Sequence, residues 1–286
     1  MNIDTLLPAT KPFIESYNHY IEQGKSVLKS KDIVFVGLVR NLELVLKNNI
    51  HKLVILGEQA KSYKIILFEN DSSDNTKEVL QTLSSNNSNI ITISTNNGRQ
   101  QYGSVKNADR TQALAEYRNI LKNYVTTNFP KCDYTIVTDM DFIDFSDDGF
   151  YNSIGWLSCH SDTIDGIAGN SFSYKIIGDN QTDKSLWNYD SWAFRYTWWH
   201  ELQNLDSMTY DRMIWFGLFI MPVGSQIIPV NSAFGGMCIY KTHQFIQGDY
   251  SGYDCEHVCF NYSLRQQIPS FQLVLNPSQR MLISEN

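Results

Sequence analysis

The chain alternates short apolar runs with segments whose apolar residues recur at helical spacing. Three apolar runs in the first half, at 32–38, 64–68 and 90–94, each have the length of one buried strand. Between these runs, apolar residues recur every three or four positions, which predicts helices. Strand and helix therefore alternate, and the pattern predicts a doubly wound α/β sheet with Rossmann-like crossovers.

A third helix and a fourth strand lead to the most informative stretch. Apolar residues recur at helical spacing from 110 to 125, and the β-branched and aromatic run 134–138 predicts a buried strand that ends in Asp139-Met140-Asp141. Ligands of open α/β sheets bind outside the carboxyl ends of the strands, so we expect these two carboxylates to face a bound molecule. One can hold Mg²⁺ or Mn²⁺ while the other holds a ribose hydroxyl or a second metal position. An acidic turn that only closes the strand is the alternative.

Beyond this stretch the pattern is irregular. We expect a strand near 164–168, a polar loop at 170–184 that serves as a lid, and a Gly-Gly turn that leads into a strand at 238–240. The first residues form an amphipathic lead-in on the outside of the domain.

The length of 286 residues favours one elaborated domain over two. Its expected parts are an N-terminal helical lead-in (1–30), an α/β half that ends in Asp-x-Asp (31–145) and a second half of the same domain (146–286).

Composition narrows the class of protein. Hydrophobic residues make up 42% of the chain, enough for a large core, and the net charge of −7 argues against a nucleic-acid partner. Five cysteines without a C-x-x-C pair indicate neither a zinc ribbon nor a disulfide framework, which favours a reducing compartment. No signal peptide or long apolar run is evident. We therefore expect a soluble cytoplasmic protein with no integral membrane segment, whose membrane association, if any, is peripheral. The oligomeric state is left open.

The helix at 110–125 precedes the strand at 134–138, so its positive end lies on the same side of the sheet as Asp139 and Asp141. Arg110 is thereby placed where a diphosphate would bind. Arg118 lies about 12 Å deeper along the helix, which favours a structural role. The segment 69–76 contains good helix caps, but it has more polar side chains than one cap needs, which favours a ligand loop.

Two segments of the second half combine aromatic, acidic and basic residues. The segment 187–199 is dense in aromatics and contains Asp190, Trp192 and Arg195, which is typical of a surface that stacks on sugars or bases, although a small aromatic core would look the same. The segment 253–257 reads Tyr-Asp-Cys-Glu-His. Its histidine is a candidate third metal ligand or a structural residue, and its two acids are candidate acid/base groups.

Taken in order, the segments KIILFENDSSDNT, RTQALAEYRN and YTIVTDMDF resemble those of GT-A nucleotide-sugar glycosyltransferases. YDSWAFR, VNSAFGGM and DCEHVCF make the chain similar to the capsule-associated, cryptococcal-type α-mannosyltransferase family and its viral and bacterial relatives. The resemblance implies a GT-A (Rossmann-like) fold with a mixed, mostly parallel central sheet flanked by helices. It also implies a metal-dependent hexosyltransferase of glycan biosynthesis, which moves a hexose from a UDP- or GDP-linked donor to a hydroxyl of a glycan or glycoconjugate.

The resemblance also implies roles for individual residues. Glu69 and Asp71 would contact the nucleoside; where many GT-A enzymes have two adjacent acids, this chain has Glu69-Asn70, so these contacts stay loosely assigned. Asp141 would bind Mn²⁺ or Mg²⁺ at the donor diphosphate, with Asp139 nearer the ribose or the metal and His257 completing the metal shell. The remaining implied site residues are Gly235, Gly236, Glu256 and Asp254, facing the donor sugar and acceptor, and Asp190, Trp192 and Arg195, binding the acceptor.

Two questions stay open in the sequence. An inverting enzyme needs a carboxylate base beside the acceptor hydroxyl, for which Glu256 and Asp254 are candidates, whereas a retaining front-face mechanism needs none. The resemblance favours retention. The alternative functions are a sugar nucleotidyltransferase, disfavoured because no G-x-G-x-x-[RK] loop follows the first strand, and a non-catalytic carbohydrate-binding protein on a transferase fold.

Overall fold

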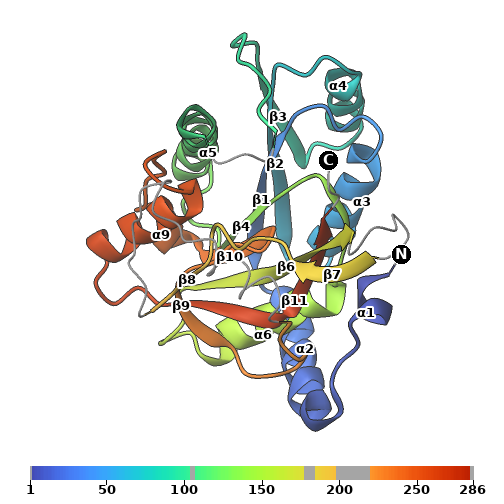
Figure 1. The fold of residues 1–286 in the computed structure, drawn as a ribbon, viewed down its shortest axis with the longest axis vertical. Coiled ribbons are helices and arrows are strands. Elements are labelled where there is room, and N and C mark those ends of the chain that lie inside the picture. The colour runs from blue at the N-terminus through green and yellow to red at the C-terminus, as the bar shows by residue number, and fades with distance from the viewer. Residues whose placement is uncertain (1, 104–106, 177–183, 198–219, 284–286) are drawn as a thin grey trace.

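The computed structural model describes residues 2–103, 107–176, 184–197 and 220–283. Within these residues the strands form one 11-stranded sheet in the order β3-β2-β1-β4-β10-β6-β11-β9-β8, with β5 paired to β11 and β7 to β6 (Figure 1). Helices cover both faces of the sheet. The expected fold class, a mixed α/β sheet flanked by helices, is confirmed.

The first half consists of four parallel strands joined by three helices. Their bounds agree with the sequence prediction to within about two residues in most cases, because each strand is an uninterrupted apolar run. The elements are β1 (Asp32–Val39), α3 (Leu46–Gly57), β2 (Ser62–Asn70), α4 (Thr76–Asn86), β3 (Ile90–Thr95), α5 (Ala108–Asn128) and β4 (Tyr134–Thr138).

The order of these strands changes direction at β1. β2 and β3 lie on one side of β1, whereas β4 lies on the other side. The carboxyl ends of β1 and β4 therefore flank a topological switch point, where open α/β sheets bind their ligands.

Beyond β4 most strand pairs are antiparallel. β10 runs antiparallel to both β4 and β6, while β6 and β11 are parallel to each other. The strands here are β5 (Phe142–Phe145), β6 (Gly166–Ile176), β7 (Lys184–Asn188), β8 (Arg195–Tyr196), β9 (Ile228–Ser232), β10 (Met237–Lys241) and β11 (Leu273–Ile283). Both halves of the chain thus share one sheet.

Two helical layers enclose the sheet (Figure 1). One hydrophobic core lies under α2, α3, α4 and α6, and the other lies under α5, α8 and α9. The amphipathic lead-in is helical as expected, with Tyr17 and Ile21 buried. The remaining helices are α1 (Ile3–Leu6), the 3-10 helix η1 (Lys11–Phe13), α2 (Ile14–Leu28), α6 (Asp147–Cys159), α8 (Thr242–Phe245) and α9 (Glu256–Gln267).

The predicted polar loop at 170–184 is wrong for its first part, because β6 continues through Asn170 to Ile176. Asn170, Ser171 and Ser173 are buried although they are polar. The neighbouring strand β11 is buried throughout and also carries polar residues, among them Asn276. A strand whose buried residues are polar lacks the run of apolar residues from which a strand is predicted. The rest of the expected lid, 177–183, lies outside the described residues.

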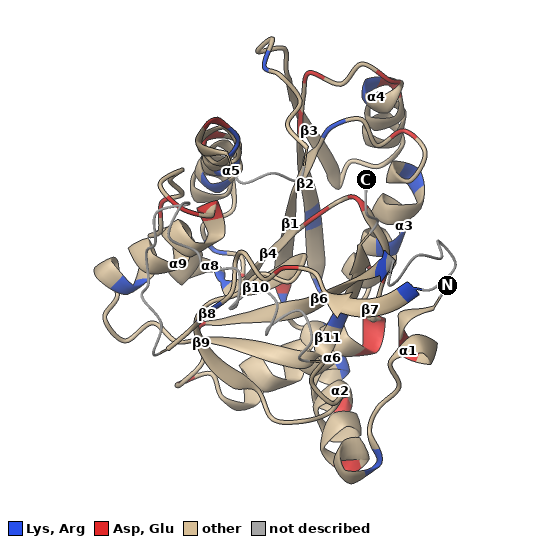
Figure 2. Ribbon diagram, in the orientation of Figure 1, with Lys and Arg blue, Asp and Glu red and all other residues tan. Residues whose placement is uncertain are grey.

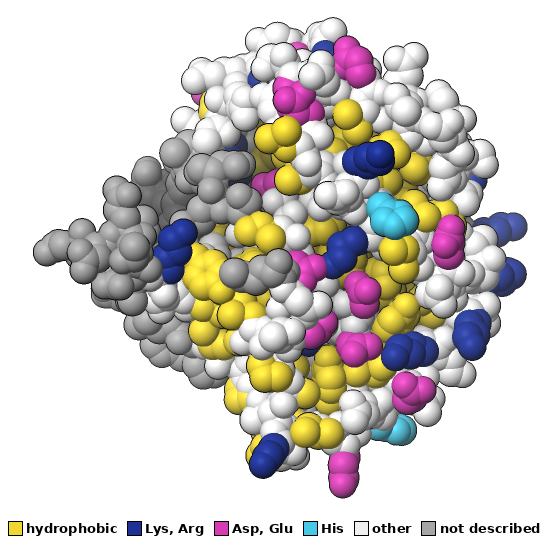
Figure 3. All heavy atoms as spheres, turned by 90° about the vertical axis from the view of Figure 1, so that its right-hand side faces the viewer, with side chains coloured by type: hydrophobic (Ala, Val, Ile, Leu, Met, Phe, Trp, Pro, Cys, Tyr) yellow, Lys and Arg dark blue, Asp and Glu magenta, His cyan; other side chains and the backbone are white. Residues whose placement is uncertain are grey.

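The surface and the cysteines add two observations. On the face shown in Figure 3, acidic and basic side chains are interspersed with hydrophobic ones. All five cysteines are free thiols. Among the helices of the described residues, none has both the length and the apolar character needed to cross a bilayer.

Candidate active site

Asp139 and Asp141 follow β4, at the carboxyl end of the strand. Figure 2 marks the acidic residues along the ribbon in red. The backbone N–H of Asp139 donates to the carbonyl of Gly236 at 2.8 Å. Its carboxylate accepts a hydrogen bond from Nη2 of Arg118 at 3.4 Å, and 30% of the side chain is exposed. The first acid of the D-x-D is therefore held by a glycine turn and an arginine, with one side open.

The two carboxylates of the D-x-D oppose each other electrostatically. Desolvation and the neighbouring charge of Asp141 raise the pKa of Asp139 to about 8, although Arg118 acts in the opposite direction. Desolvation also raises the pKa of Asp141, against the influence of a backbone amide, Arg118 and Arg110. Both carboxylates resist ionisation in the protein alone. A divalent cation bound between them would stabilise their charged forms.

Arg118 is a member of this site, which the sequence did not predict. Its side chain is only 6% exposed, and Nε donates to Oε1 of Glu256 at 3.0 Å. The guanidinium lies 5.2 Å from the ring centroid of Phe234. One signal in the sequence was available: Arg118 interrupts the apolar stripe of α5 between Leu114 and Leu121. A charged residue at such a position needs a buried partner.

Glu256 and His257 begin α9, and both are buried. The His257 ring stacks on Phe234 at a centroid distance of 3.7 Å, with Nε2 3.5 Å from Oε1 of Glu256. Neither ring nitrogen has a hydrogen-bond partner among the described residues. Burial, followed by the charge of Arg118, lowers the pKa of His257 well below its ordinary value, so the ring is neutral near pH 7.

A neutral imidazole has the lone pair that a metal ligand needs. In the part of the chain that the structure describes, however, no three acidic, histidine or cysteine side chains gather closely enough to form a metal cluster. The role of His257 as third metal ligand therefore stays a prediction.

The Gly-Gly turn connects the D-x-D to the aromatic segment. Gly235 and Gly236 have φ angles of 60° and 73°, and a Cβ on Gly235 would lie 2.1 Å from the carbonyl oxygen of Gly169. The N–H of Gly235 donates to Oδ2 of Asp190 at 2.9 Å. Burial raises the pKa of Asp190 to about 6. The predicted Gly-Gly turn is confirmed, and its close backbone approach lets one turn link Asp190 to Asp139.

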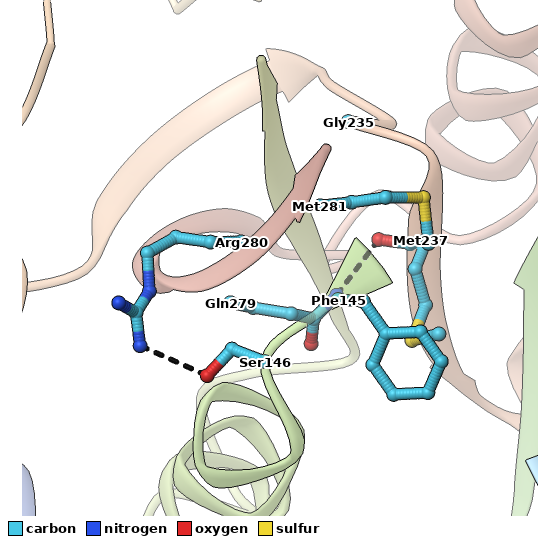
Figure 4. A pocket seen from close by; sticks show the side chains of 7 residues that line it. All are labelled: Phe145, Ser146, Gly235, Met237, Gln279, Arg280 and Met281. Carbon is cyan, nitrogen blue, oxygen red and sulfur yellow. Dashed lines mark hydrogen bonds between the residues drawn. The ribbon is translucent and has the colours of Figure 1, made fainter. Parts of the chain in front are cut away.

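The space behind this turn is part of the packing. It is lined by Phe145, Ser146, Gly235, Met237, Gln279, Arg280 and Met281 (Figure 4). Gln279 donates to the carbonyl of Met237, and Arg280 donates to Ser146. Because these polar side chains bond to the protein itself, the space supports the turn and we do not assign it a ligand.

The aromatic segment meets α5 and α9. The guanidinium of Arg110 lies 5.7 Å from the ring centroid of Trp192, so the structure brings the predicted diphosphate and acceptor residues together. Arg195 is 2% exposed and donates to both carboxylate oxygens of Asp254, at 2.9 and 3.1 Å. Asp254 is fully buried. This pair joins the aromatic segment to the start of α9, and neither side chain reaches the surface.

The residues predicted to contact the nucleoside are engaged by the protein. Glu69 is fully buried and accepts hydrogen bonds from the backbone of Ser72 and the hydroxyl of Ser94. Asp71, at φ 53°, accepts from the N–H groups of Asn97 and Gly98 at 2.7 and 2.8 Å. The acidic side chains of this loop therefore hydrogen-bond within the protein and stabilise the loop. Their contact with a nucleoside stays a prediction.

Comparison with known proteins gives similarity in structure only. No family model matches the sequence, and a search of the curated proteins finds no match. Among solved structures, the chain is similar to GalNAc-T7 crystallised with UDP, GalNAc and Mn²⁺, with a TM-score of 0.53 and 13% identity over 89% of this chain. The chain spans 44% of that structure.

Two further solved structures show weaker similarity. They are the mannosyltransferase PcManGT from Pyrobaculum calidifontis in complex with GDP-Man and Mn²⁺ (TM-score 0.48, 10% identity, 95% of this chain and 65% of that one) and S. aureus TarS 1-349 (TM-score 0.47, 12% identity, 89% and 58%). At such identities the likeness to GalNAc-T7 establishes the fold alone, and the expected GT-A fold is confirmed. The narrower resemblance to the capsule-associated family stays a prediction.

Proposed function

We propose that the protein is a metal-dependent glycosyltransferase that moves a hexose from a UDP- or GDP-linked sugar to a hydroxyl of a glycan or glycoconjugate. The observation that carries this proposal is the convergence at the carboxyl end of β4. The mutually opposed acids Asp139 and Asp141, the Gly235-Gly236 turn and the arginine-held Glu256 meet there, at the switch point of a GT-A sheet.

The residues present fit a divalent cation. Mg²⁺ and Mn²⁺ are hard cations that use one or two carboxylates and take further oxygens from substrate phosphates and water. Asp141 would hold the ion, and Asp139, which Arg118 also contacts, would serve the ribose or the ion. When bound, such an ion neutralises charge that develops on a diphosphate leaving group.

Residues of the chain itself would bind and orient the two substrates. Arg110 lies in the first turn of α5, where its charge and the positive end of the helix favour a diphosphate. Its stacking partner Trp192, with Asp190, offers the acceptor an aromatic face and a hydrogen-bond acceptor. The Gly-Gly turn carries no side chains that would keep the donor sugar from the backbone. We assign the donor to 31–145 and the acceptor to 146–286.

The two candidate bases favour a retaining reaction. Asp254 is buried against Arg195, and Glu256 is buried against Arg118. Each carboxylate is therefore engaged by a buried arginine instead of standing free beside an acceptor hydroxyl, and a front-face mechanism needs no enzymic base. We therefore propose retention, with Asp254 as a residue that positions α9. Proton NMR of the freshly released sugar would show an anomeric configuration equal to that of the donor, and an inverted product would contradict retention.

A thermal-shift panel of UDP- and GDP-sugars, with and without Mn²⁺, tests the function without knowledge of the acceptor. A ligand that binds the folded state raises the melting temperature by mass action. We expect one nucleotide to give a Mn²⁺-dependent shift that Asp141→Ala abolishes. Asp74→Ala, a change in the structural loop after β2, should lower the melting temperature but leave the shift.

Other outcomes would point to the alternatives. Release of pyrophosphate from a nucleoside triphosphate and a sugar phosphate would indicate a nucleotidyltransferase. Glycan binding that survives Asp141→Ala, with no donor-dependent shift, would indicate a carbohydrate-binding protein.

A further inference from the structure

We infer that Arg118 is a positioning residue that holds Asp139, at the donor site, and Glu256, at the start of α9, in one fixed arrangement. The inference rests on the proposed function and deepens it: Asp139 on the donor side and Glu256 at the start of the acceptor-side helix must keep one relative position during transfer, and Arg118 contacts both.

The geometry of the guanidinium suits a bridge. Nε donates to Glu256 at 3.0 Å, and Nη2 donates to Asp139 at 3.4 Å. A guanidinium is planar and rigid, so bonds from two of its nitrogens fix both acceptors relative to each other. One acid follows a strand of the first half, and the other begins a helix of the second half. The bridge therefore spans the two parts to which we assign donor and acceptor.

The surroundings hold Arg118 itself in place. The side chain is 6% exposed and lies against the ring of Phe234, the residue that precedes the Gly235-Gly236 turn. Its guanidinium thus contacts the end of β4, the start of the glycine turn and the first residue of α9. A buried arginine with little rotamer freedom loses less entropy for each contact that it fixes.

The charges explain why a cation is needed at this point. Arg118 lies 3.0 Å from the carboxylate of Glu256 and 3.4 Å from that of Asp139, and the Glu256 side chain is 6% exposed. Without Arg118, Glu256 would remain buried without its cation, which is strongly unfavourable. Nη1 of Arg118 has no hydrogen-bond partner within the described residues. Buried polar groups with a purely structural role are almost always hydrogen-bonded, so an N–H donor of Arg118 without a partner favours a functional role.

Kinetics of donor hydrolysis test the inference, with Lys122→Met as the matched control. Lys122 lies one turn further along α5, is 10% exposed and pairs with Asp249. Arg118→Met should lower kcat at least 30-fold and change KM less than threefold, because the acids lose their alignment more than their affinity. Arg118→Lys should recover part of kcat, since lysine restores the positive charge but not the two rigidly spaced N–H donors of the guanidinium. Lys122→Met should lower the melting temperature and leave kcat within twofold.

Two results would overturn the inference. The first is a kcat for Arg118→Met no lower than that of Lys122→Met. The second is a loss seen only in KM and melting temperature. If Arg118→Met does not fold, Arg118→Lys carries the test, and a kcat within twofold of the original protein would overturn the inference.

A separate experiment distinguishes failure of the inference from failure of the proposed function. If the unaltered protein neither binds nor hydrolyses any donor, the proposed function is wrong, but the bridge can still be tested by urea unfolding. A bridge predicts that the effect of Arg118→Met on the unfolding midpoint is at least halved in an Asp139→Asn background and also in a Glu256→Gln background. An undiminished effect in either background would show that Arg118 does not bridge the two acids.

Discussion

The loops that follow β2 and β4 look alike in sequence but differ in electrostatics. Both are acidic and both begin at the carboxyl end of a parallel strand. After β2, the carboxylates of Asp71 and Asp74 are partly desolvated, yet hydrogen bonds from nearby backbone N–H groups hold the pKa of each below its usual value. After β4, desolvation raises the pKa values of both Asp139 and Asp141, and the charge of Asp141 raises the pKa of Asp139 further.

The difference separates a structural acid from a functional one. A carboxylate that accepts several N–H bonds is already stabilised by the protein, whereas two carboxylates that destabilise each other are stabilised only when a ligand arrives. The loop after β2 is therefore stabilised by its own hydrogen bonds, and the loop after β4 is the candidate for binding a ligand. Four predictions test this contrast between the two loops.

The largest effect is expected from Asp141→Asn. We predict a fall in Mn²⁺-dependent donor hydrolysis of about 100-fold or more, equivalent to about 3 kcal/mol of transition-state stabilisation. The melting temperature without metal should stay equal or rise, since a repulsive charge is removed. The measurement is initial rate together with a thermal melt. A variant that loses stability while retaining its rate would contradict the assignment of Asp141 to the metal.

Asp71→Ala should act on stability instead. Removing the acceptor of two backbone N–H groups at 97 and 98 should lower the free energy of unfolding by about 2 kcal/mol. Urea unfolding measures this, and hydrogen exchange should show faster exchange of these amides. Asp71→Asn is the matched control, because asparagine tolerates the φ of 53° and keeps one acceptor oxygen. Equal losses in both variants would show that charge, rather than hydrogen bonding, anchors the loop.

The two loops should also respond to pH in opposite directions. Because the pKa of Asp139 is about 8 in the folded state, against about 4 in an unfolded chain, the folded metal-free protein keeps a proton that the unfolded chain releases. The free energy of unfolding should therefore fall as pH rises from about 4 to 8. The slope should be below about 1.4 kcal/mol per pH unit, since the side chain is 30% exposed.

Asp139→Asn should remove this slope. His257 contributes a slope of opposite sign in both proteins, so its contribution cancels when the free energies of unfolding of the variant and the unaltered protein are subtracted. Asp71 contributes stability above pH 4 that is lost only as pH falls through its lowered pKa, so Asp71→Asn should leave the slope between pH 5 and 8 unchanged. An unaltered slope in Asp139→Asn would mean that Asp139 ionises normally.

The smallest effect is expected from Asp74→Ala. One oxygen of Asp74 accepts from the N–H of Thr76 at the start of α4, and the other accepts from the N–H of Glu43. Loss of such a capping interaction should lower the free energy of unfolding by about 1 kcal/mol, measured in urea. Donor binding should be unchanged, and a weakened donor-induced thermal shift would show that the loop after β2 also contacts the ligand.

Much of the first half could be predicted because three of its four strands, β1, β2 and β4, are mostly buried on both faces. Continuous apolar runs such as Tyr134 to Thr138 therefore appear in the sequence, and the D-x-D could be placed at a strand end. In the second half, only the first part of β6 was predicted, as a strand near 164–168, and β11 was not, since a polar interior that includes Asn170 and Asn276 hides the strand pattern. The resemblance to GT-A enzymes supplied the fold that the pattern alone did not.

The site was predictable in its acids but not in their states. The sequence by itself determined that Asp139 and Asp141 follow a buried strand and that two glycines permit a close turn at 235–236, because these properties depend on neighbours in the chain. Only the tertiary structure decided that Arg118 serves two acids, that Asp254 is fully buried against Arg195 and that Asp71 is saturated by a distant loop. A pKa or an ion pair depends on groups that are close in space, and folding alone brings those together.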